Sequence, residues 1–252
     1  MDLANKVIAI TGAGQGLGQQ MALSLAKCGA NLALIDIELE GLIQTEQQCQ
    51  KMGVIAKSYQ ANVTNEEQVV RAFGQIDADF KCLNGLINNA GIMRDGLLVK
   101  QKEGKLSAMS LEQFQSVLEV NVTGSFLCGR EASKVMLKTD SKGVLINISS
   151  VARAGNIGQS NYSASKAAVA AMSVVWAKEL GRYGIRSVAI APGVVKTAMT
   201  DQIKPLAMER LLSMVPVGRL GQAEEIAATI QFALENDFIT GRVLEIDGGM
   251  RM

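Results

Sequence analysis

The chain has 252 residues, of which 48% are hydrophobic, 19% are charged and only three are proline. This composition is typical of a globular protein, and we expect residues 1–252 to form one domain, because α/β sheets of this length commonly share one core. The net charge of +1 lacks the basic excess that binding to nucleic-acid backbones requires. The absence of histidine excludes a Ser-His-Asp triad, a Cys-His pair and a His-ligated metal. Proton transfer near neutral pH therefore needs another side chain with a shifted pKa.

The cysteines lie at positions 28, 49, 82 and 128, without the spacing that zinc sites use. We expect reduced thiols and a cytoplasmic protein. The first residues, MDLANKVIAI, do not resemble a signal peptide. No apolar run reaches the length of about 18 residues that a membrane helix needs, so no membrane partner is predicted.

Short apolar runs rich in β-branched residues alternate along the chain with longer segments of helical period. This alternation is typical of a doubly wound, parallel α/β sheet with helices on both faces. Seven strands are expected, at 7–11, 31–36, 54–60, 83–88, 143–149, 186–191 and 243–246. Helices are expected at 16–27, 39–51, 65–78, 111–137, 163–183 and 223–235.

Two segments interrupt this alternation. Residues 94–110 are polar at their centre and predict an exposed excursion, either irregular or a hairpin. All the prolines, Pro192, Pro205 and Pro216, follow the sixth predicted strand. The apolar segment 198–215 among them is a candidate lid over an apolar part of a substrate, with packing against the body or against a second subunit as the alternative.

The first strand leads into Thr11-Gly12-Ala13-Gly14-Gln15-Gly16-Leu17-Gly18 and then into a helix. Glycines at such a turn let the backbone approach a pyrophosphate, which the N–H groups of the helix terminus stabilise; a tight turn without a ligand is the alternative. Asp36 ends the second strand, where a carboxylate accepts hydrogen bonds from ribose hydroxyls and repels a 2′-phosphate. Gln15 offers no positive charge to that phosphate. NAD(H) is therefore predicted over NADP(H), unless Asp36 only caps the next helix.

Polar side chains follow the fourth and fifth predicted strands. Asn88 begins the segment NNAG, and a structural role at the strand ends is favoured for it over ligand contact. Tyr162 and Lys166 lie four residues apart in YSASK, so their polar ends share one helix face. A tyrosine needs its pKa of about 10 lowered by roughly 3 units to act near neutrality, which a lysine ammonium and an oxidised nicotinamide favour. Ser149 can hydrogen-bond the substrate oxygen, so the three side chains together predict an active site without histidine.

With these motifs in this order, the chain resembles the classical short-chain dehydrogenase/reductases over essentially its whole length. The segments GQSNYSASKAAV and ITGRVLEIDGGM look most like the 3-oxoacyl-acyl-carrier-protein reductase branch. The resemblance implies a Rossmann-type sheet, usually in a homotetramer. It rests on TGAGQGLG at 11–18, NNAG at 88–91, Asn121 in VNVTG, Ser149, YSASK at 162–166, and Pro192-Gly193 followed by Thr197.

The resemblance also implies residue roles. Tyr162 would be the general acid/base, and Lys166 would lower its pKa and hold the nicotinamide ribose. Ser149, chosen because the family serine lies 13 residues before the tyrosine, would polarise the carbonyl, and Asn121 would hold a water that links Lys166 to solvent. Asn62 stands where the family often has an adenine-binding aspartate. The implied cofactor contacts are Gly12, Gln15, Gly16, Leu17, Asp36, Asn62, Val63, Asn89, Tyr162, Lys166, Val195 and Thr197.

The sequence therefore predicts an NAD(H)-dependent oxidoreductase that interconverts a secondary alcohol and a ketone, foremost a 3-oxoacyl/3-hydroxyacyl thioester of fatty acid metabolism. The alternatives are a small-polyol or sugar dehydrogenase and a non-catalytic NAD-binding redox sensor. The thioester would be carried on acyl carrier protein or CoA, and an acidic carrier would need a basic surface. The candidates for that surface are Lys134, Lys138, Lys142, Lys178, Arg182 and Arg186. No metal and no nucleic-acid partner are expected.

Overall fold

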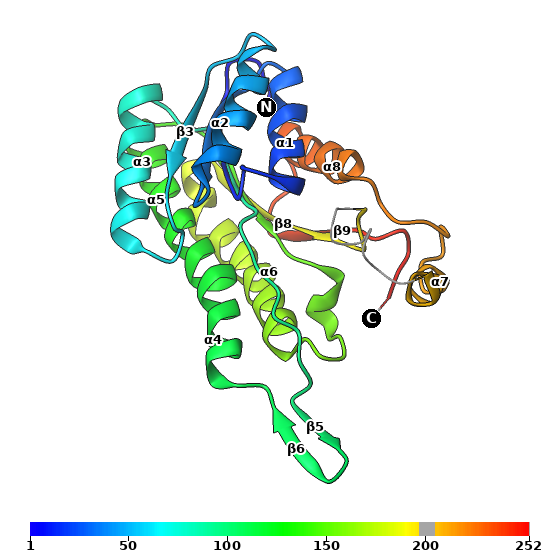
Figure 1. Cartoon of the computed structure of the whole chain (residues 1–252). Helices are drawn as coiled ribbons and strands as arrows, with labels where there is room; N and C mark the ends of the chain where they lie inside the picture. Colours follow the sequence, from blue (N-terminus) through cyan, green and yellow to red (C-terminus); the bar gives the residue numbers. More distant parts are fainter. Residues whose placement is uncertain (197–204, 252) are drawn as a thin grey trace.

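The computed structural model describes residues 1–196 and 205–251, and a seven-stranded sheet lies at its centre (Figure 1). The strand order is β3-β2-β1-β4-β7-β8-β9, and all neighbouring strands are parallel. The chain winds outward from β1 in one direction and from β4 in the other, so the predicted Rossmann-type α/β fold is confirmed. The strands are β1 Val7–Thr11, β2 Asn31–Asp36, β3 Ala56–Gln60, β4 Gly85–Asn88, β7 Gly143–Ile148, β8 Ile185–Pro192 and β9 Arg242–Ile246.

Helices cover both faces of the sheet, as predicted (Figure 1). One face carries α1 (Gly16–Lys27), α2 (Leu39–Gln50) and α8 (Ala223–Glu235). The other face carries α3 (Glu66–Phe80), α5 (Gly124–Lys138) and α6 (Ser160–Leu180), and α4 (Leu111–Leu118) packs against α6. None of the helices in the described part of the chain is long and apolar enough to cross a membrane.

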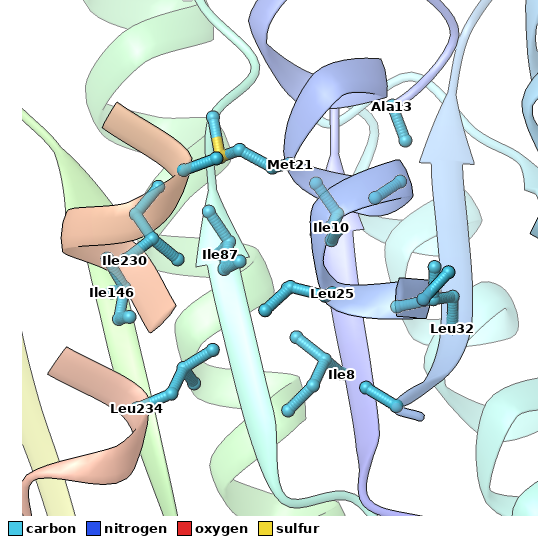
Figure 2. Packing of buried hydrophobic residues seen from close by; sticks show 14 of the residues in the cluster. Ile8, Ile10, Ala13, Met21, Leu25, Leu32, Ile87, Ile146, Ile230 and Leu234 are labelled. Atoms are coloured by element: carbon cyan, nitrogen blue, oxygen red, sulfur yellow. The ribbon is translucent and has the colours of Figure 1, made fainter. Parts of the chain in front are cut away.

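The core explains why the strands could be located from their composition. On one face, Leu25 of α1 and Leu234 of α8 pack with Ile8 and Ile87 of the central strands, and all four side chains are buried (Figure 2). Burial of each such side chain stabilises the fold by about 1.5–3 kcal/mol. Because helices cover both faces, every residue of β1 is buried, and the strand appears in the sequence as a continuous apolar run.

The predicted helix over 111–137 is interrupted. It ends as α4 at Leu118, and residues Glu119–Thr123 form a π-helical turn before α5 begins. A π turn adds one residue to a helical turn, and the apolar residues on either side still follow a helical period. Hydrophobic periodicity alone therefore does not reveal it. The structure also contains α7 (Pro205–Ser213), within the candidate lid segment whose residues 197–204 lie outside the described chain.

The predicted excursion at 94–110 is a β-hairpin. Its strands, β5 (Val99–Lys102) and β6 (Lys105–Ala108), pair only with each other and project beyond α4 and α6 (Figure 1). Every residue of both strands is exposed. The sequence left an irregular excursion and a hairpin as alternatives, and the structure shows the hairpin.

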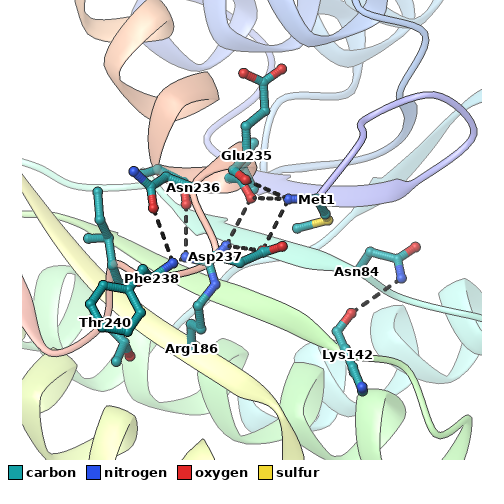
Figure 3. A network of polar contacts seen from close by, with 12 residues as sticks. Met1, Asn84, Lys142, Arg186, Glu235, Asn236, Asp237, Phe238 and Thr240 are labelled. Carbon is teal, nitrogen blue, oxygen red and sulfur yellow. Dashed lines mark hydrogen bonds and ion pairs between the residues drawn. The ribbon is translucent and has the colours of Figure 1, made fainter.

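At the amino end of the sheet, Arg186 of β8 binds the last turn of α8 (Figure 3). Its guanidinium donates hydrogen bonds to the carbonyl oxygens of Ala233 and Leu234 at 2.9 and 2.8 Å and to that of Ile239 at 2.9 Å. These bonds satisfy carbonyl groups that a helix end leaves without partners. Arg186 therefore serves the fold and is only 12% exposed, which removes it from the candidates for a basic docking surface.

The cysteines are unpaired, as expected for reduced thiols. Cys49 and Cys128 are buried, and burial raises the pKa of both thiols to about 12. Thiols with raised pKa values are poor nucleophiles and poor metal ligands. Within residues 1–196 and 205–251, no cluster of three acidic or thiol side chains that could hold a metal ion is present.

Candidate active site

Thr11 joins the carboxyl ends of β1 and β4. Its hydroxyl oxygen accepts hydrogen bonds from the backbone N–H groups of Asn89 and Ala90, both at 3.0 Å. The Asn89 amide donates back to the carbonyl oxygens of Thr11 and Gly12, both at 3.1 Å. The winding direction of the sheet changes between these strands, and ligands of such sheets bind at that point. The structure thus brings Gly12 and Asn89, two predicted cofactor contacts, to this position.

The glycine loop after β1 forms a cradle at the start of α1. Gly12 has φ +66° and Gly16 has φ +56°, a region that glycine adopts without strain. A Cβ on Gly18 would collide with the Gly12 carbonyl oxygen, whereas nothing lies within 4 Å of the Cβ position at Gly16. Gln15, the exposed N-cap of α1, makes no side-chain capping bond. The first N–H groups of α1 are therefore not capped by the Gln15 side chain, and the space next to Gly16 is open. Free N–H donors beside open space suit the binding of a pyrophosphate.

Asp36, at the end of β2, lies beside that loop. One carboxylate oxygen accepts a 2.9 Å hydrogen bond from the Gly14 N–H, and the other accepts one of 3.2 Å from the N–H of Glu38, the N-cap of α2. Asp36 therefore does bond the backbone at the start of α2, the structural alternative that the sequence analysis gave for it. This bond does not exclude ribose binding, because each carboxylate oxygen has a second lone pair. None of the cations in the described chain forms a salt bridge with Asp36, so its charge is available to repel a phosphate.

The remaining predicted cofactor contacts differ in their surroundings. The side-chain oxygen Oδ1 of Asn62 accepts from the backbone N–H and the hydroxyl of Thr64 at 3.0 and 2.9 Å, so the side-chain N–H groups of Asn62 are the part suited to meet a base. Val63 is buried, and Leu17 packs against the core beneath α1. Val195 forms an isolated parallel bridge with Gly221. Thr197 lies outside the described residues.

Tyr162 and Lys166 share one face near the start of α6, as their spacing predicted. The Lys166 Nζ atom lies 5.5 Å from the centroid of the Tyr162 ring. Lys166 is 5% exposed, and Nζ donates a 2.7 Å hydrogen bond to the carbonyl oxygen of Ile148 at the end of β7. Burial lowers the pKa of the Lys166 ammonium to about 8. An ammonium has three N–H donors and this one binds a single acceptor in the described chain, which fits the ribose hydroxyls of a dinucleotide.

The surroundings of Tyr162 act against its ionisation in the free protein. Burial raises the pKa of the phenol above its ordinary value, and the carboxylate of Asp95 raises it further. A hydrogen bond with the Ser150 side chain lowers the pKa and only partly compensates. Tyr162 therefore carries its proton in this state, and additional positive charge is needed to produce a phenolate.

The structure differs from the sequence prediction at the serine. Ser149 is 2% exposed, and its hydroxyl donates a 2.7 Å hydrogen bond to the carbonyl oxygen of Lys166, which occupies its only hydrogen. Ser150 is the serine whose side chain lies close enough to Tyr162 to lower the pKa of the phenol. Its oxygen accepts a 3.1 Å hydrogen bond from the Ala152 N–H, which leaves the hydroxyl hydrogen free to donate toward Tyr162. Counting 13 residues back from Tyr162 thus selected Ser149, whereas the structure has the Ser150 side chain next to Tyr162.

Asn121 lies in the π-helical turn between α4 and α5. Its side chain accepts from the Ile92 N–H at 2.8 Å and donates to the Ile92 carbonyl at 3.1 Å and to the Ser165 hydroxyl at 2.9 Å. A Cβ on Gly91 would lie 3.1 Å from Asn121 Oδ1 and 3.5 Å from Lys166 Nζ, so the three residues meet. Because both amide N–H groups of Asn121 are occupied, a water between Asn121 and Lys166 would have to donate to an Asn121 oxygen, either the side-chain Oδ1 or the backbone carbonyl.

Asn88 has the structural role that was favoured from sequence. Its amide nitrogen donates to the Asn147 side chain at 2.8 Å and to the Ser125 carbonyl at 3.1 Å. Asn147 donates in turn to the Ser173 hydroxyl at 2.9 Å. This buried chain of bonds joins β4, β7, α5 and α6, and so fixes the strands that carry the site.

Two further groups of residues adjoin the site; the sequence analysis missed the first, and of the second it identified only Leu211 and Val215, within the predicted lid segment 198–215. Asn161 accepts from the Tyr162 N–H and donates to the Arg94 carbonyl, both at 2.8 Å, and Gln159 donates to the Asp95 carboxylate at 2.9 Å. Both lie in GQSNYSASKAAV, but no periodic pattern indicates their partners across the fold. On the other side, an apolar wall adjoins Ser150, formed by Val151, Val194, Leu211, Val215 and Met250.

Comparison with known proteins agrees with this site. A family profile described as enoyl-(acyl carrier protein) reductase matches residues 12–251. The chain is 38% identical to a 3-oxoacyl-acyl-carrier-protein reductase, FabG, of Thermotoga maritima, over 99% of both chains. It is 36% identical to a 3-oxoacyl-acyl-carrier-protein reductase of Homo sapiens, over 98% of this chain and 99% of the relative. It is 33% identical to a (3R)-3-hydroxyacyl-CoA dehydrogenase of Canis lupus familiaris, over 99% of this chain and 98% of the relative.

Proposed function

The chain belongs to the short-chain dehydrogenase/reductase family of oxidoreductases acting on CH–OH groups, and from this premise we propose that it interconverts 3-oxoacyl and 3-hydroxyacyl thioesters with NAD(H). The observation that carries the proposal is the convergence of Tyr162, Lys166 and Ser150 beside the glycine loop. A tyrosine with a cation and a hydroxyl donor supplies acid/base chemistry in a chain without histidine.

Tyr162 is the proposed general acid/base. In the oxidative direction, its phenolate oxygen takes the proton of the substrate hydroxyl while the carbon loses a hydride. In reduction, its hydroxyl gives the proton to the carbonyl oxygen. Because burial and Asp95 raise the pKa of Tyr162, the phenolate needs the Lys166 ammonium and a second positive charge close to it.

Lys166 and the glycine loop are the proposed holders of the nicotinamide cofactor. When bound, this cofactor accepts or supplies the hydride, and its oxidised ring carries a positive charge. Lys166 keeps its bond to Ile148 and offers its remaining N–H donors to the nicotinamide ribose. With a pKa of about 8, it is mainly cationic at neutral pH.

Ser150, and not Ser149, is the proposed donor to the substrate oxygen. Its hydroxyl is beside Tyr162, so both side chains can bind the same oxygen as negative charge develops there. Asn121 is a positioning residue, because its side-chain bonds to Ile92 and Ser165 hold the loop after β4 against α6.

The preference for NAD(H) over NADP(H) rests on Asp36. Its carboxylate lies 2.9 Å from the Gly14 nitrogen, within the loop proposed to hold the pyrophosphate. A 2′-phosphate at this position would meet a negative charge, and the loop residue Gln15 offers no compensating one. Ribose hydroxyls, in contrast, can donate hydrogen bonds to the carboxylate.

Two observations support a thioester substrate. Val194 and Leu211 are partly exposed next to the buried Val151, and such apolar side chains suit an acyl chain. The relatives from Thermotoga maritima and Canis lupus familiaris are named for acyl-carrier-protein and CoA thioesters. We therefore propose an acyl group delivered on acyl carrier protein or CoA.

We also propose a homotetramer. The edge strand β9 is only partly covered, and Phe232 of the adjoining α8 is 50% exposed. An open sheet edge beside an exposed aromatic side chain is suited to pairing with a second copy. Sedimentation analysis of the purified protein tests this assembly.

The function is tested by two assays on one preparation. NADH oxidation is followed with an acetoacetyl thioester, and NAD⁺ reduction is followed with a panel of polyols and sugars. We expect turnover of the thioester, with NADH preferred to NADPH. Turnover of polyols alone would make the enzyme a polyol dehydrogenase, and tight NADH binding without any turnover would favour a redox sensor.

A further inference from the structure

The hairpin β5–β6 has two unlike faces. Side chains alternate across a strand, and residues directly opposite each other lie on the same face. One face therefore carries Val99, Leu106 and Ala108, and the other carries Lys100, Lys102 and Lys105. The register that defines them pairs Val99 with Ala108, Gln101 with Leu106, Lys100 with Ser107 and Lys102 with Lys105.

The lysine face is poorly neutralised within the chain. Among residues 1–196 and 205–251, its only salt bridge joins Lys102 to Glu103 in the turn at 3.8 Å, and both side chains are more than 70% exposed. Lys102 and Lys105 lie directly opposite each other, an arrangement of like charges that destabilises a strand pair. A two-stranded sheet on its own is only marginally stable. A negatively charged partner would relieve this repulsion and stabilise the hairpin.

The base of the hairpin is attached beside the proposed active site. The Gly96 N–H donates a 2.7 Å hydrogen bond to the Gly158 carbonyl, and the Asp95 carboxylate accepts one of 2.9 Å from Gln159, three residues before Tyr162. On the other side, Gln113 of α4 donates to the carbonyls of Arg94 and Asp95 at 2.9 and 3.0 Å. The base of the hairpin is thus held beside the proposed active site, while its strands project beyond α4 and α6 (Figure 1).

We propose that Lys100, Lys102 and Lys105 form the docking surface for an acidic acyl carrier protein that delivers the thioester. This inference rests on the thioester function proposed above. A carrier protein presents its acyl group on a long flexible arm, so its folded part must bind outside the site and next to the entrance. A positively charged arm anchored at that entrance provides this contact and increases the rate of encounter.

Four of the six basic residues selected from sequence do not offer the same surface. Lys134 forms a salt bridge with Glu131 at 2.7 Å, and Lys138 forms one with Asp77 at 2.6 Å. Arg182 lies over the Tyr183 ring, with 4.7 Å between the guanidinium carbon and the ring centroid. Arg186 binds carbonyl oxygens at the far end of the sheet. The hairpin lysines are therefore the better candidates for recognition of an acidic carrier.

The test is a triple variant, Lys100→Glu, Lys102→Glu and Lys105→Glu, assayed with two substrates. One is acetoacetyl-loaded acyl carrier protein, and the other is the small, uncharged acetoacetyl-N-acetylcysteamine. We expect KM for the carrier substrate to rise at least about tenfold, since three attractive contacts become repulsive. The kcat and KM for the small thioester should not change, because these side chains do not reach the site. In the unmodified enzyme, salt should raise KM for the carrier substrate only.

The matched control reverses three exposed lysines at the carboxyl ends of α1, α2 and α3, Lys27→Glu, Lys51→Glu and Lys81→Glu, and should leave both KM values unchanged. Equal effects of the hairpin variant and the control would overturn the proposal. A change of oligomeric state in the hairpin variant, without a selective rise of the carrier KM, would also overturn it and show that the hairpin packs on a second copy. If the unmodified enzyme turns over neither thioester, the proposed function fails, and the docking proposal fails with it.

Discussion

The Ser149 hydroxyl donates a hydrogen bond of 2.7 Å to the carbonyl oxygen of Lys166. This bond joins the end of β7 to the second turn of α6, and it uses the only hydrogen that the Ser149 side chain can donate. The neighbouring Ser150 bonds Tyr162 instead. Two adjacent serines thus have separate neighbours: Ser149 is bonded to the Lys166 carbonyl, and Ser150 lies next to Tyr162, the proposed acid/base.

Replacing each serine by alanine separates their roles. Ser150→Ala should lower kcat by about 10²–10³, the usual cost of removing one donor to a developing oxyanion. Ser149→Ala should lower the free energy of unfolding by about 1 kcal/mol, because the Lys166 carbonyl loses its partner, with a much smaller effect on kcat. Turnover assays and urea unfolding measure the two quantities. Loss of activity in Ser149→Ala with full activity in Ser150→Ala would restore the assignment made from sequence.

Tyr162→Phe tests the acid/base assignment. The substitution removes one hydroxyl from a half-buried ring. It should abolish turnover in both directions, because Tyr162 is the only group proposed to transfer the proton. NADH affinity should remain nearly intact, since the glycine loop, Asp36 and Lys166 are unchanged. Fluorescence titration with NADH provides the affinity. Substantial residual turnover would show that another group transfers the proton.

The cofactor preference should respond to the charge of Asp36. Asp36→Ala should narrow the preference for NADH over NADPH, measured as the ratio of kcat/KM values, because the repulsion of a 2′-phosphate disappears. Asp36→Asn is the matched variant, since it can still accept the bond from the Gly14 N–H but carries no charge. If the two variants differ in stability but show the same reduced ratio of kcat/KM for NADH over NADPH, the charge of Asp36 determines the cofactor preference. An unchanged ratio in both would show that the carboxylate does not select the cofactor.

The strands and several helices could be predicted from the sequence because their burial creates a continuous apolar run or a clear helical period. The bounds of β1, β2, α1 and α8 agree with the expected ones. The serine could not be predicted in this way. Residues Val151–Ala154 form a 3₁₀ turn between Ser150 and α6, and the path of such a turn decides which hydroxyl faces Tyr162. Counting residues along an irregular segment cannot supply that path.

Charge pairing was only partly visible in the sequence. Lys134 pairs with Glu131 three residues earlier on α5, a spacing that the predicted helix contains, whereas Asp77, the partner of Lys138, lies on α3. The three lysines of residues 99–108 belong to a segment that was predicted only as an exposed excursion. The register of the hairpin, which the sequence does not determine, is what places them on one face.

The pH dependence of stability should reveal the burial of Lys166. Its pKa is about 8 in the folded chain, below the ordinary value of 10.5. Between pH 8 and pH 10.5, Lys166 is therefore protonated in the unfolded chain and largely neutral in the folded chain. The free energy of unfolding that depends on Lys166 rises with pH over this range. Buried cysteines and Tyr162 have raised pKa values and act in the opposite direction, but these contributions cancel in a comparison with Lys166→Met. The free energy of unfolding of the unmodified protein relative to Lys166→Met should increase by up to about 1.4 kcal/mol per pH unit above pH 8, and remain constant below it. Urea unfolding of both proteins across this range measures the difference. Parallel curves would mean that the Lys166 ammonium is not desolvated in the folded chain.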